Sequence, residues 1–186
     1  YDGYSTKVYH AEPDGSEKSI DGFINAIAED YQCNLWIGTH NGLYRLNKRN
    51  DRIEKISLPH PQVTNVETVA CTHKGAVWVG TNKGLFIKEE NETSFTQYKF
   101  ETNIDVKSIL EDKRGQIWIG TWSQGLYRYD PTRRQIYTYH NVCPGNSAHV
   151  IFQDKNENIW IGTWRYGLLK MQNPYDMQPV SYTHLR

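Results

Sequence analysis

Short runs of alternating apolar and polar residues recur along the chain at nearly constant spacing. Residues 24–29, 66–71 and 106–111 alternate in this way, and a shorter run covers residues 150–153. Alternation with a period of two is typical of a half-buried β-strand, and no stretch sustains the 3.6-residue period of an amphipathic helix. The pattern therefore predicts an all-β chain of short strands.

One apolar segment, a Trp followed two residues later by a Gly, occurs four times. The Trp residues are 42, 40 and 42 residues apart. These repeat anchors are Trp36, Gly38, Trp78, Gly80, Trp118, Gly120, Trp160 and Gly162. Because the anchors recur in every unit, they serve the unit itself, and we expect the four large indoles to pack in its core.

Each unit of about 40–42 residues is predicted to hold four antiparallel strands. In the third unit the strands are residues 106–111, the Trp segment, 126–129 and 135–140, with turns at 112–115 and 130–133. A four-stranded unit of this length is the size of one blade of a β-propeller. The chain is therefore predicted to be a partial propeller.

The repeats also predict how the chain is divided. We expect residues 1–171 to be a propeller fragment that contains the end of one blade, three full blades and most of a fourth. Residues 172–186 are expected to form an irregular tail. From about residue 179 the tail fits no repeat position and resembles translated sequencing-adaptor sequence, so we expect it to be non-native. Four blades of a larger ring would self-associate through their open faces, unless residues 6–10 complete the last blade and close a small ring.

Composition excludes several classes of protein. Lys and Arg together number 21, as do Asp and Glu, so a net charge of zero gives no electrostatic footprint for nucleic acid or an anionic membrane surface. No apolar run is long enough to span a membrane, and no signal peptide is visible. Cys33, Cys71 and Cys143 are not at metal-ligand spacing, and the seven His are scattered, so neither a metal site nor a cofactor is expected.

The segment from Ile109 to Thr121, followed by Gly125 to Asp130, resembles the two-component regulator propeller repeat. The resemblance recurs in register in all four units, including a turn Asp at Asp30, Asp112 and Asp154, where the second unit has Thr72. It implies a propeller of about seven blades in the periplasmic sensor region of a hybrid two-component histidine kinase. Such regions typically detect oligosaccharides and signal to a kinase or other output domain, which would lie outside this chain.

Ligand binding is expected where the repeats differ, at the turns between the second and third strands. The candidate residues are His40, Asn41, Asn82, Lys83, Trp122, Gln124, Trp164, Arg165 and Tyr166. Flat aromatic faces with polar neighbours suit a sugar ring, which stacks by its C–H face and needs hydrogen-bond partners for its hydroxyls. The alternative is that Trp122 and Trp164 pack on the adjacent blade or on a partner domain.

Three functions remain open from the sequence. The first is a ligand-sensing module, the second a protein-interaction or dimerisation scaffold, and the third a propeller lyase or glycosidase. The three turn Asp residues are predicted to bond the backbone two residues on rather than to act in catalysis. A lyase or glycosidase would need an acid or His pair that does not repeat, and the candidates for it are the loop residues His60 and His149. We nevertheless expect no catalytic residues in this chain.

Overall fold

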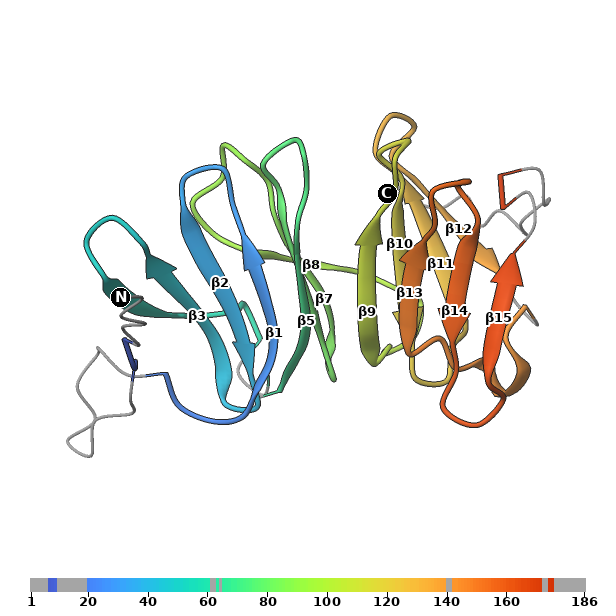
Figure 1. Cartoon of the computed structure of the whole chain (residues 1–186), viewed down its shortest axis with the longest axis horizontal. Coiled ribbons are helices and arrows are strands. Elements are labelled where there is room, and N and C mark those ends of the chain that lie inside the picture. Colours follow the sequence, from blue (N-terminus) through green and yellow to red (C-terminus); the bar gives the residue numbers. More distant parts are fainter. Residues whose placement is uncertain are drawn as a thin grey trace, which may run out of the picture.

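The computed structural model describes residues 7–9, 20–60, 63, 65–139, 142–171 and 174–175. These residues form four antiparallel sheets and one 3₁₀ turn, and the predicted all-β fold is confirmed (Figure 1). We name the sheets blades 1 to 4. Blade 1 holds β1 (Ile24–Glu29), β2 (Asn34–Thr39), β3 (Gly42–Asn47) and β4 (Arg52–Ile56). Blade 2 holds β5 (Val66–Cys71), β6 (Val77–Thr81), β7 (Gly84–Lys88) and β8 (Thr96–Tyr98).

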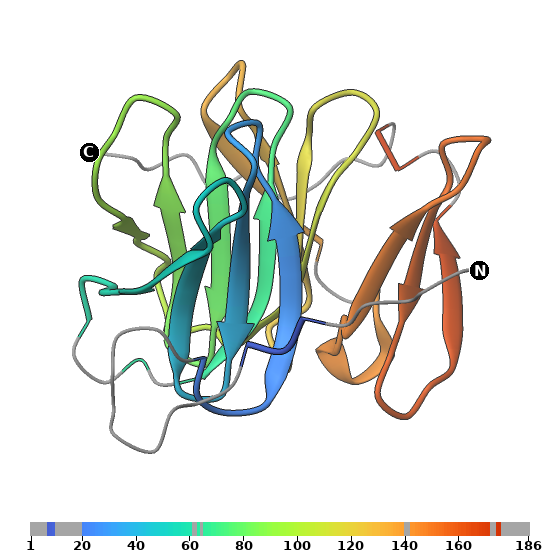
Figure 2. The same ribbon diagram turned by 60° about the vertical axis from the view of Figure 1, so that its left-hand side comes forward.

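Blade 3 holds β9 (Val106–Glu111), β10 (Ile117–Thr121), β11 (Leu126–Asp130) and β12 (Gln135–Tyr139). After the 3₁₀ turn η1 (Pro144–Asn146), blade 4 holds β13 (Val150–Gln153), β14 (Ile159–Gly162) and β15 (Leu168–Met171). The strands of each blade pair in sequence order. The first strands β1, β5, β9 and β13 contact one another from blade to blade, so they form the inner edge of the arrangement (Figure 2).

Each blade packs one face against the next blade along the chain, and the anchor Trp lies in that interface. We call the face that carries the Trp the front face. Trp36 packs among Val66 and Val79 of blade 2, and Trp118 packs among Ile151 and Ile161 of blade 4. Trp36, Trp78 and Trp118 are at most 3% exposed. Trp160 is only half-buried, because no described residue covers the front face of blade 4.

The anchor Gly residues let the blades approach closely. A Cβ placed on Gly38 would lie 2.6 Å from a methyl group of Val66, and one on Gly80 would lie 2.5 Å from Val106. At Gly120 the nearest atom would be the carbonyl oxygen of Ala148, at 2.4 Å. These contacts are shorter than any side chain tolerates, so the first strand of the next blade fits only over a Gly.

The turn Asp residues hold the turn and the anchor Trp together. As predicted, Oδ1 of Asp112 accepts the backbone N–H two residues on, from Arg114 at 2.9 Å. Its Oδ2 accepts the Trp118 indole N–H at 2.7 Å, a contact that the sequence reasoning did not foresee. Asp30 and Asp154 make the same two kinds of bond, to Gln32 and Trp36 and to Asn156 and Trp160 respectively.

At the N-terminus, residues 7–9 form no strand, although the sequence predicts that the chain begins with the end of a preceding blade. Lys7 and Tyr9 instead bond the Asp51 carboxylate in the β3–β4 turn of blade 1. Blade 1, not blade 4, is therefore the contact of these residues. Most of the expected preceding blade and of the tail, including residues 1–3 and 179–186, lies outside the described residues. The division of the chain at residue 171 stays a prediction.

Candidate functional site

The turns between the second and third strands share one construction. The Thr at the end of the second strand donates its hydroxyl to the carbonyl of the Gly at the start of the third or directly before it, as Thr121 does to Gly125 at 2.7 Å. The same hydroxyl accepts a backbone N–H from the turn, from Gln124 in blade 3 and Tyr166 in blade 4. The positive φ of Gly125, 84°, completes the turn. The ends of each turn are thus fixed, while the residues between them are free to vary.

These turns lie on the same face as the connections that enter each blade. The N–H of Trp122 donates to the carbonyl of Asp105 at 2.9 Å, and that of His40 donates to Phe23 at 3.0 Å. Between blades, the N–H of Ala148 donates to Thr121 at 2.9 Å. The turns that were predicted to bind a ligand therefore belong to one continuous surface of turns and connections. We call this surface the turn face.

Three aromatic rings meet on the turn face at the junction of blades 3 and 4. The Trp122 and Trp164 ring centroids are 5.3 Å apart, and the His149 ring lies 5.9 Å from Trp122 and 5.4 Å from Trp164. Trp122 is 39% exposed and Trp164 58%. We call these three residues the aromatic cluster. The two Trp side chains thus contact each other and still present ring surface to solvent.

Tyr166 extends this aromatic surface. It is 57% exposed, and a Cβ on Gly145 would lie 2.6 Å from its ring. Gly145, in η1, has a φ of 67° and belongs to the connection that carries His149. The absence of a side chain at Gly145 therefore makes room for the Tyr166 ring beside the cluster.

A second set of variable residues lies at the start of the first strands. Asn25, Glu67 and Lys107 each occupy a bulge in the pairing of the first and second strands. His149 directly precedes β13 at the equivalent place in blade 4. Of these four residues, only His149 was singled out from the sequence, as a loop residue. The position holds a different residue in every unit, but so does the position after it, so variation alone did not mark it out.

These variable residues are bonded from blade to blade. Asn25 donates to Asn65 at 3.0 Å, and Asn65 donates to Glu67 at 2.6 Å. Lys107 lies 2.8 Å from a Glu67 oxygen, 3.2 Å from an Asp105 oxygen and 5.4 Å from the centre of the Trp122 ring. Burial alone would lower the pKa of Lys107, but the bonds to Glu67 and Asp105 outweigh it and raise the pKa, so the ammonium stays charged.

Several buried polar atoms on or directly under the turn face have no hydrogen-bond partner among the described residues. They are Asn82 Oδ1, Ser108 Oγ, Gln124 Oε1, Ser147 Oγ and His149 Nδ1. Folded proteins satisfy the great majority of such atoms, and all five belong to the turn face or to the strand beginning directly beneath it. Four of the five atoms, all but that of Asn82 in the blade 2 turn, belong to blade 3 or to its connection to blade 4, so a polar ligand or water at this junction would gain hydrogen bonds.

The remaining candidate residues lie further from the aromatic cluster along the turns. His40 and Asn41 are in blade 1, where the Asn41 amide donates to Asp21 at 2.8 Å. Lys83 is in blade 2, and its carbonyl accepts from Gln97 at 3.0 Å. Arg165 is exposed in the blade 4 turn beside Trp164. The structure thus gathers the blade 3 and blade 4 candidates and leaves those of blade 1 apart from them.

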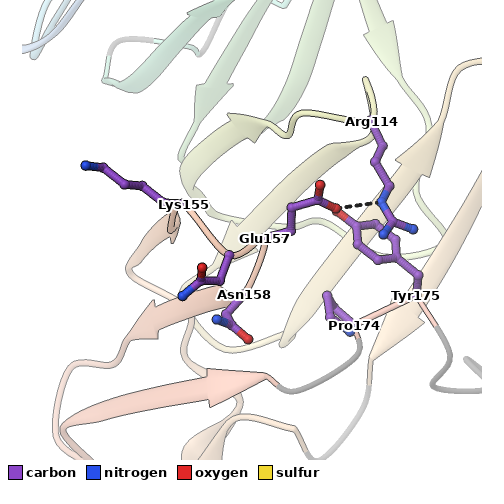
Figure 3. Close-up of a pocket in the computed structure, with 7 residues that line it drawn as sticks. Arg114, Lys155, Glu157, Asn158, Pro174 and Tyr175 are labelled. Atoms are coloured by element: carbon purple, nitrogen blue, oxygen red, sulfur yellow. Dashed lines mark hydrogen bonds and ion pairs between the residues drawn. The ribbon is translucent and has the colours of Figure 1, made fainter.

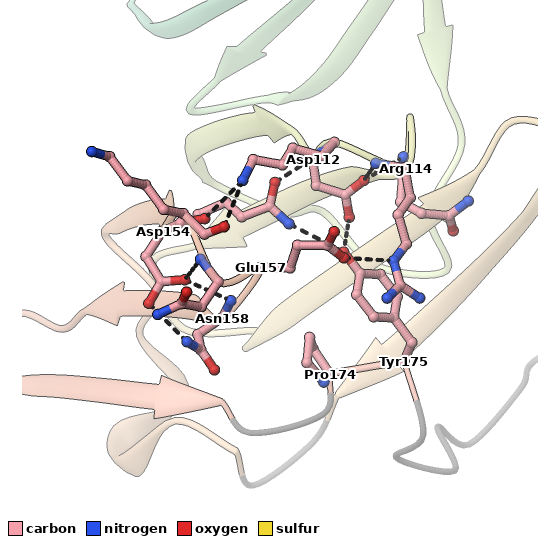
Figure 4. Close-up of polar contacts among 12 residues, drawn as sticks. Asp112, Arg114, Asp154, Glu157, Asn158, Pro174 and Tyr175 are labelled. Atoms are coloured by element: carbon pink, nitrogen blue, oxygen red, sulfur yellow. Dashed lines mark hydrogen bonds and ion pairs between the residues drawn. The ribbon is translucent and has the colours of Figure 1, made fainter.

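A pocket of about 280 Å³ lies on the opposite face, between the first turns of blades 3 and 4 and residues 174–175 (Figure 3). The Arg114 guanidinium stacks 3.8 Å from the centre of the Tyr175 ring, and its Nε lies 3.0 Å from a Glu157 oxygen. The Tyr175 hydroxyl donates to Asp112 at 2.7 Å (Figure 4). Burial, then the bond to Asp112, raises the pKa of Tyr175. These groups are already paired with one another, and Tyr175 packs 6.3 Å from Trp118, so the contacts brace blade 3.

The described residues show no activated nucleophile or metal cluster. Burial raises the pKa of Cys71 to about 12 and that of Cys143 to about 11, so both stay protonated at neutral pH. Within the same residues, no group of three or more His, Cys, Asp or Glu is placed to hold a metal ion, and no helix is long and apolar enough to cross a membrane.

Comparison with known proteins agrees with the repeat pattern. The model of the two component regulator propeller family matches residues 18–41, 101–123 and 144–165. Histidine kinase P4 from Formosa agariphila is 33% identical over an alignment 88 residues long, which covers 42% of this chain and 6% of the kinase. The chain therefore spans a small part of the curated relative that it matches.

Solved structures give the same picture. The extracellular domain of a putative one component system from B. thetaiotaomicron is 28% identical, with a TM-score of 0.66 over 79% of this chain and 21% of that domain. An extracellular domain from the same organism, described as part of a putative hybrid two component system, has a TM-score of 0.73 at 23% identity, over 93% of this chain and 24% of that one. Virginiamycin B lyase from Staphylococcus aureus, at 16% identity and a TM-score of 0.63 over 82% of this chain and 56% of the lyase, shares the fold alone. The resemblance of the repeats to the two-component regulator propeller family is thereby confirmed, since the family model matches three segments of the chain.

Proposed function

We propose that this chain is a ligand-sensing segment of a two-component sensor and that it binds an oligosaccharide on the turn face at the junction of blades 3 and 4. One observation carries the proposal: the aromatic cluster occupies positions that vary among the four blades, and buried polar atoms without partners among the described residues lie near it. Residues that shape the blade recur in all four units, whereas the cluster residues occur only where the blades differ.

The chemistry of the cluster fits a sugar. Trp122 and Trp164 offer exposed apolar ring faces, and flat rings of this kind bind the C–H face of a pyranose while excluding water. Gln124, Asn82 and His149 supply hydrogen-bonding groups whose present positions leave an atom unpaired. Rotation of the half-buried Asn82 and Gln124 amides would direct their unpaired oxygens to a ligand. Binding sites commonly combine an apolar surface with a few polar groups in this way.

We also propose that binding is passed to a kinase or other output domain of the same polypeptide, and that the segment is periplasmic. The match to the family model and the resemblance to an extracellular domain of a bacterial signalling system support both the signalling role and the periplasmic location. Catalysis by the chain itself is not part of the proposal.

The experiment removes one aromatic ring at a time. We expect Trp122→Ala and Trp164→Ala each to weaken oligosaccharide binding by about 1–3 kcal/mol, by analogy with the stacking of bases on aromatic side chains. This corresponds to roughly 5- to 150-fold in affinity by calorimetry. Tyr31→Ala is the matched control, since Tyr31 is 68% exposed and lies in a turn on the opposite face. Unchanged binding in both Trp variants, with melting temperatures that match the parent protein, would contradict the proposal.

A scaffold role is the second candidate, and the front face of blade 4 favours it. Val150, Phe152 and Leu168 are 58–66% exposed on that face, and contiguous apolar surface of this kind usually marks an interface. If the face is used for self-association, Phe152→Asp should convert an oligomer to a monomer in light scattering while ligand affinity stays unchanged. A monomeric parent protein would remove this candidate.

A further inference from the structure

The charges at the centre of the turn face bear on which class of sugar the site takes. Glu67, Asp105 and Lys107 form one ion cluster beneath Trp122. The cluster carries two carboxylates and one ammonium, so its net charge is negative. The ammonium side chain is also the least exposed of the three: Lys107 is 12% exposed, Glu67 21% and Asp105 32%. The two carboxylates are thus the more exposed members of this cluster, while the ammonium is the group that lies against the Trp122 ring.

The unpaired atoms on the turn face also favour a ligand with hydroxyl groups over an anionic one. Asn82 Oδ1 and Gln124 Oε1 can only accept a hydrogen bond, and the hydroxyls of Ser108 and Ser147 can accept or donate. A sugar hydroxyl has an O–H to donate to such oxygens, whereas a carboxylate or a sulfate has none. An anionic group placed here would leave the acceptors unpaired and would add like-charge repulsion from Glu67 and Asp105.

Cations also lie at the rim of the turn face, and two of them belong to the candidate turns. Lys83 is half-buried in the blade 2 turn, and Arg165 is exposed in the blade 4 turn. Rim charges interact through water and are screened by salt, so they change affinity less than the charges beneath the rings. Lys83, Arg165 and Lys107 together outnumber Glu67 and Asp105 by one charge, so these five residues give a strongly cationic ligand no net attraction.

We infer that the site is built for an uncharged oligosaccharide, which donates its hydroxyls to the carboxylate and amide oxygens, and that Glu67 and Asp105 reject sugars carrying uronic acid or sulfate groups. This inference rests on the proposed function and specifies the ligand class of the same site. It assigns a role to Glu67 and Asp105, which the aromatic cluster alone does not require.

The experiment compares three sets of tetrasaccharides on the intact chain by calorimetry. The neutral set is cellotetraose, xylotetraose and maltotetraose, the acidic set is tetragalacturonate and tetraguluronate, and the cationic probe is the chitosan tetramer. We expect binding from the neutral set alone, and we expect Trp122→Ala to weaken it. An acidic or chitosan ligand that binds at least as well as the neutral ones, and depends on Trp122, overturns this inference while the oligosaccharide proposal stands. Binding by no member of any set overturns both.

A charge variant tests the role of the carboxylates directly. Glu67→Gln keeps an accepting oxygen and removes one negative charge, so it should raise affinity for tetragalacturonate about tenfold or more and leave the affinity for the bound neutral sugar within about threefold. Asp105→Asn should act in the same direction and serves if Glu67→Gln does not fold. Glu157→Gln is the matched control, because Glu157 is also paired with a cation but lies on the opposite face. Equal affinity for the acidic sugar in all four proteins would overturn the assignment of Glu67 and Asp105.

Discussion

Blades 3 and 4 carry the same repeat, yet the same residues lie in different surroundings. Trp118 is fully buried under blade 4, whereas Trp160 is half-buried. Leu126 is 0% exposed, whereas the equivalent Leu168 is 66% exposed. The bonds within each blade are nevertheless kept, since both indoles donate to the turn Asp, at 2.7 Å and 2.9 Å. The comparison separates what a blade forms by itself from what its neighbour supplies.

Hydrogen bonds between residues close in the sequence form within a single blade. The Asp–Trp bond spans six residues, and the Thr–Gly turn spans three or four. Burial of the front face belongs to the pair of blades, as expected when a repeat contacts only its neighbours. Stability in this chain should therefore depend on the interfaces between blades more than on any one blade.

The largest expected effect is a difference in stability between alanine variants of two anchor Trp residues. Trp118→Ala should destabilise the protein by about 3–5 kcal/mol, because it removes a large buried ring from a closed interface. Trp160→Ala should cost only about 1–2 kcal/mol, since part of its ring is already in water. Chemical denaturation of the two variants measures the difference. Equal losses would mean that the front face of blade 4 is covered in solution, and light scattering on the same samples would then identify self-association.

The extent of sequence prediction follows from the same distinction. Trp118, Gly120 and Asp112 recur at fixed spacing, so the repeat pattern sufficed to predict the strands, the turns and the core role of the anchors. The Asp–Trp bond was missed because its two partners were considered separately. Lys107 was missed because attention went to the turns, although the position varies just as much. The contact between Trp122 and Trp164 could not be predicted, since it depends on the distance between two blades, which no local pattern contains.

The second comparison concerns the anchor Gly residues. Gly120→Ala should destabilise the chain by about 1–3 kcal/mol, as overpacking does, because the new Cβ would lie 2.4 Å from the Ala148 carbonyl oxygen. Gly162→Ala should change stability by less than about 1 kcal/mol, since its Cβ would lie 3.5 Å from the nearest atom, in Val150 of its own blade. Melting temperatures of the two variants test this. A marked loss in Gly162→Ala would show that another blade approaches that position.

The smallest expected effect is a dependence of protein stability on pH in the acid range. The hydrogen bond from the Trp160 indole, followed by those from Asn158 and the turn backbone, lowers the pKa of Asp154 to about 2, although desolvation opposes the shift. The folded pKa thus lies below the unfolded value of about 3.9. Asp154 therefore contributes stability above about pH 4, and this contribution is lost as the pH falls from about 4 to about 2.

The measurement follows melting temperature from pH 6 to pH 2 in the parent protein and in Asp154→Asn. We expect the parent to be the more stable of the two above about pH 4, and we expect the gap to close as the pH approaches 2. Trp160→Ala removes the bond that contributes most to the shift, so in that background Asp154→Asn should produce a smaller gap with less dependence on pH. A gap that stays constant down to pH 2 in the Trp160 background and in the parent alike would mean that the exposed Asp154–Trp160 pair of blade 4 is not formed in solution. Blade 4 would then depend on a neighbour for its internal bonds as well as for its burial.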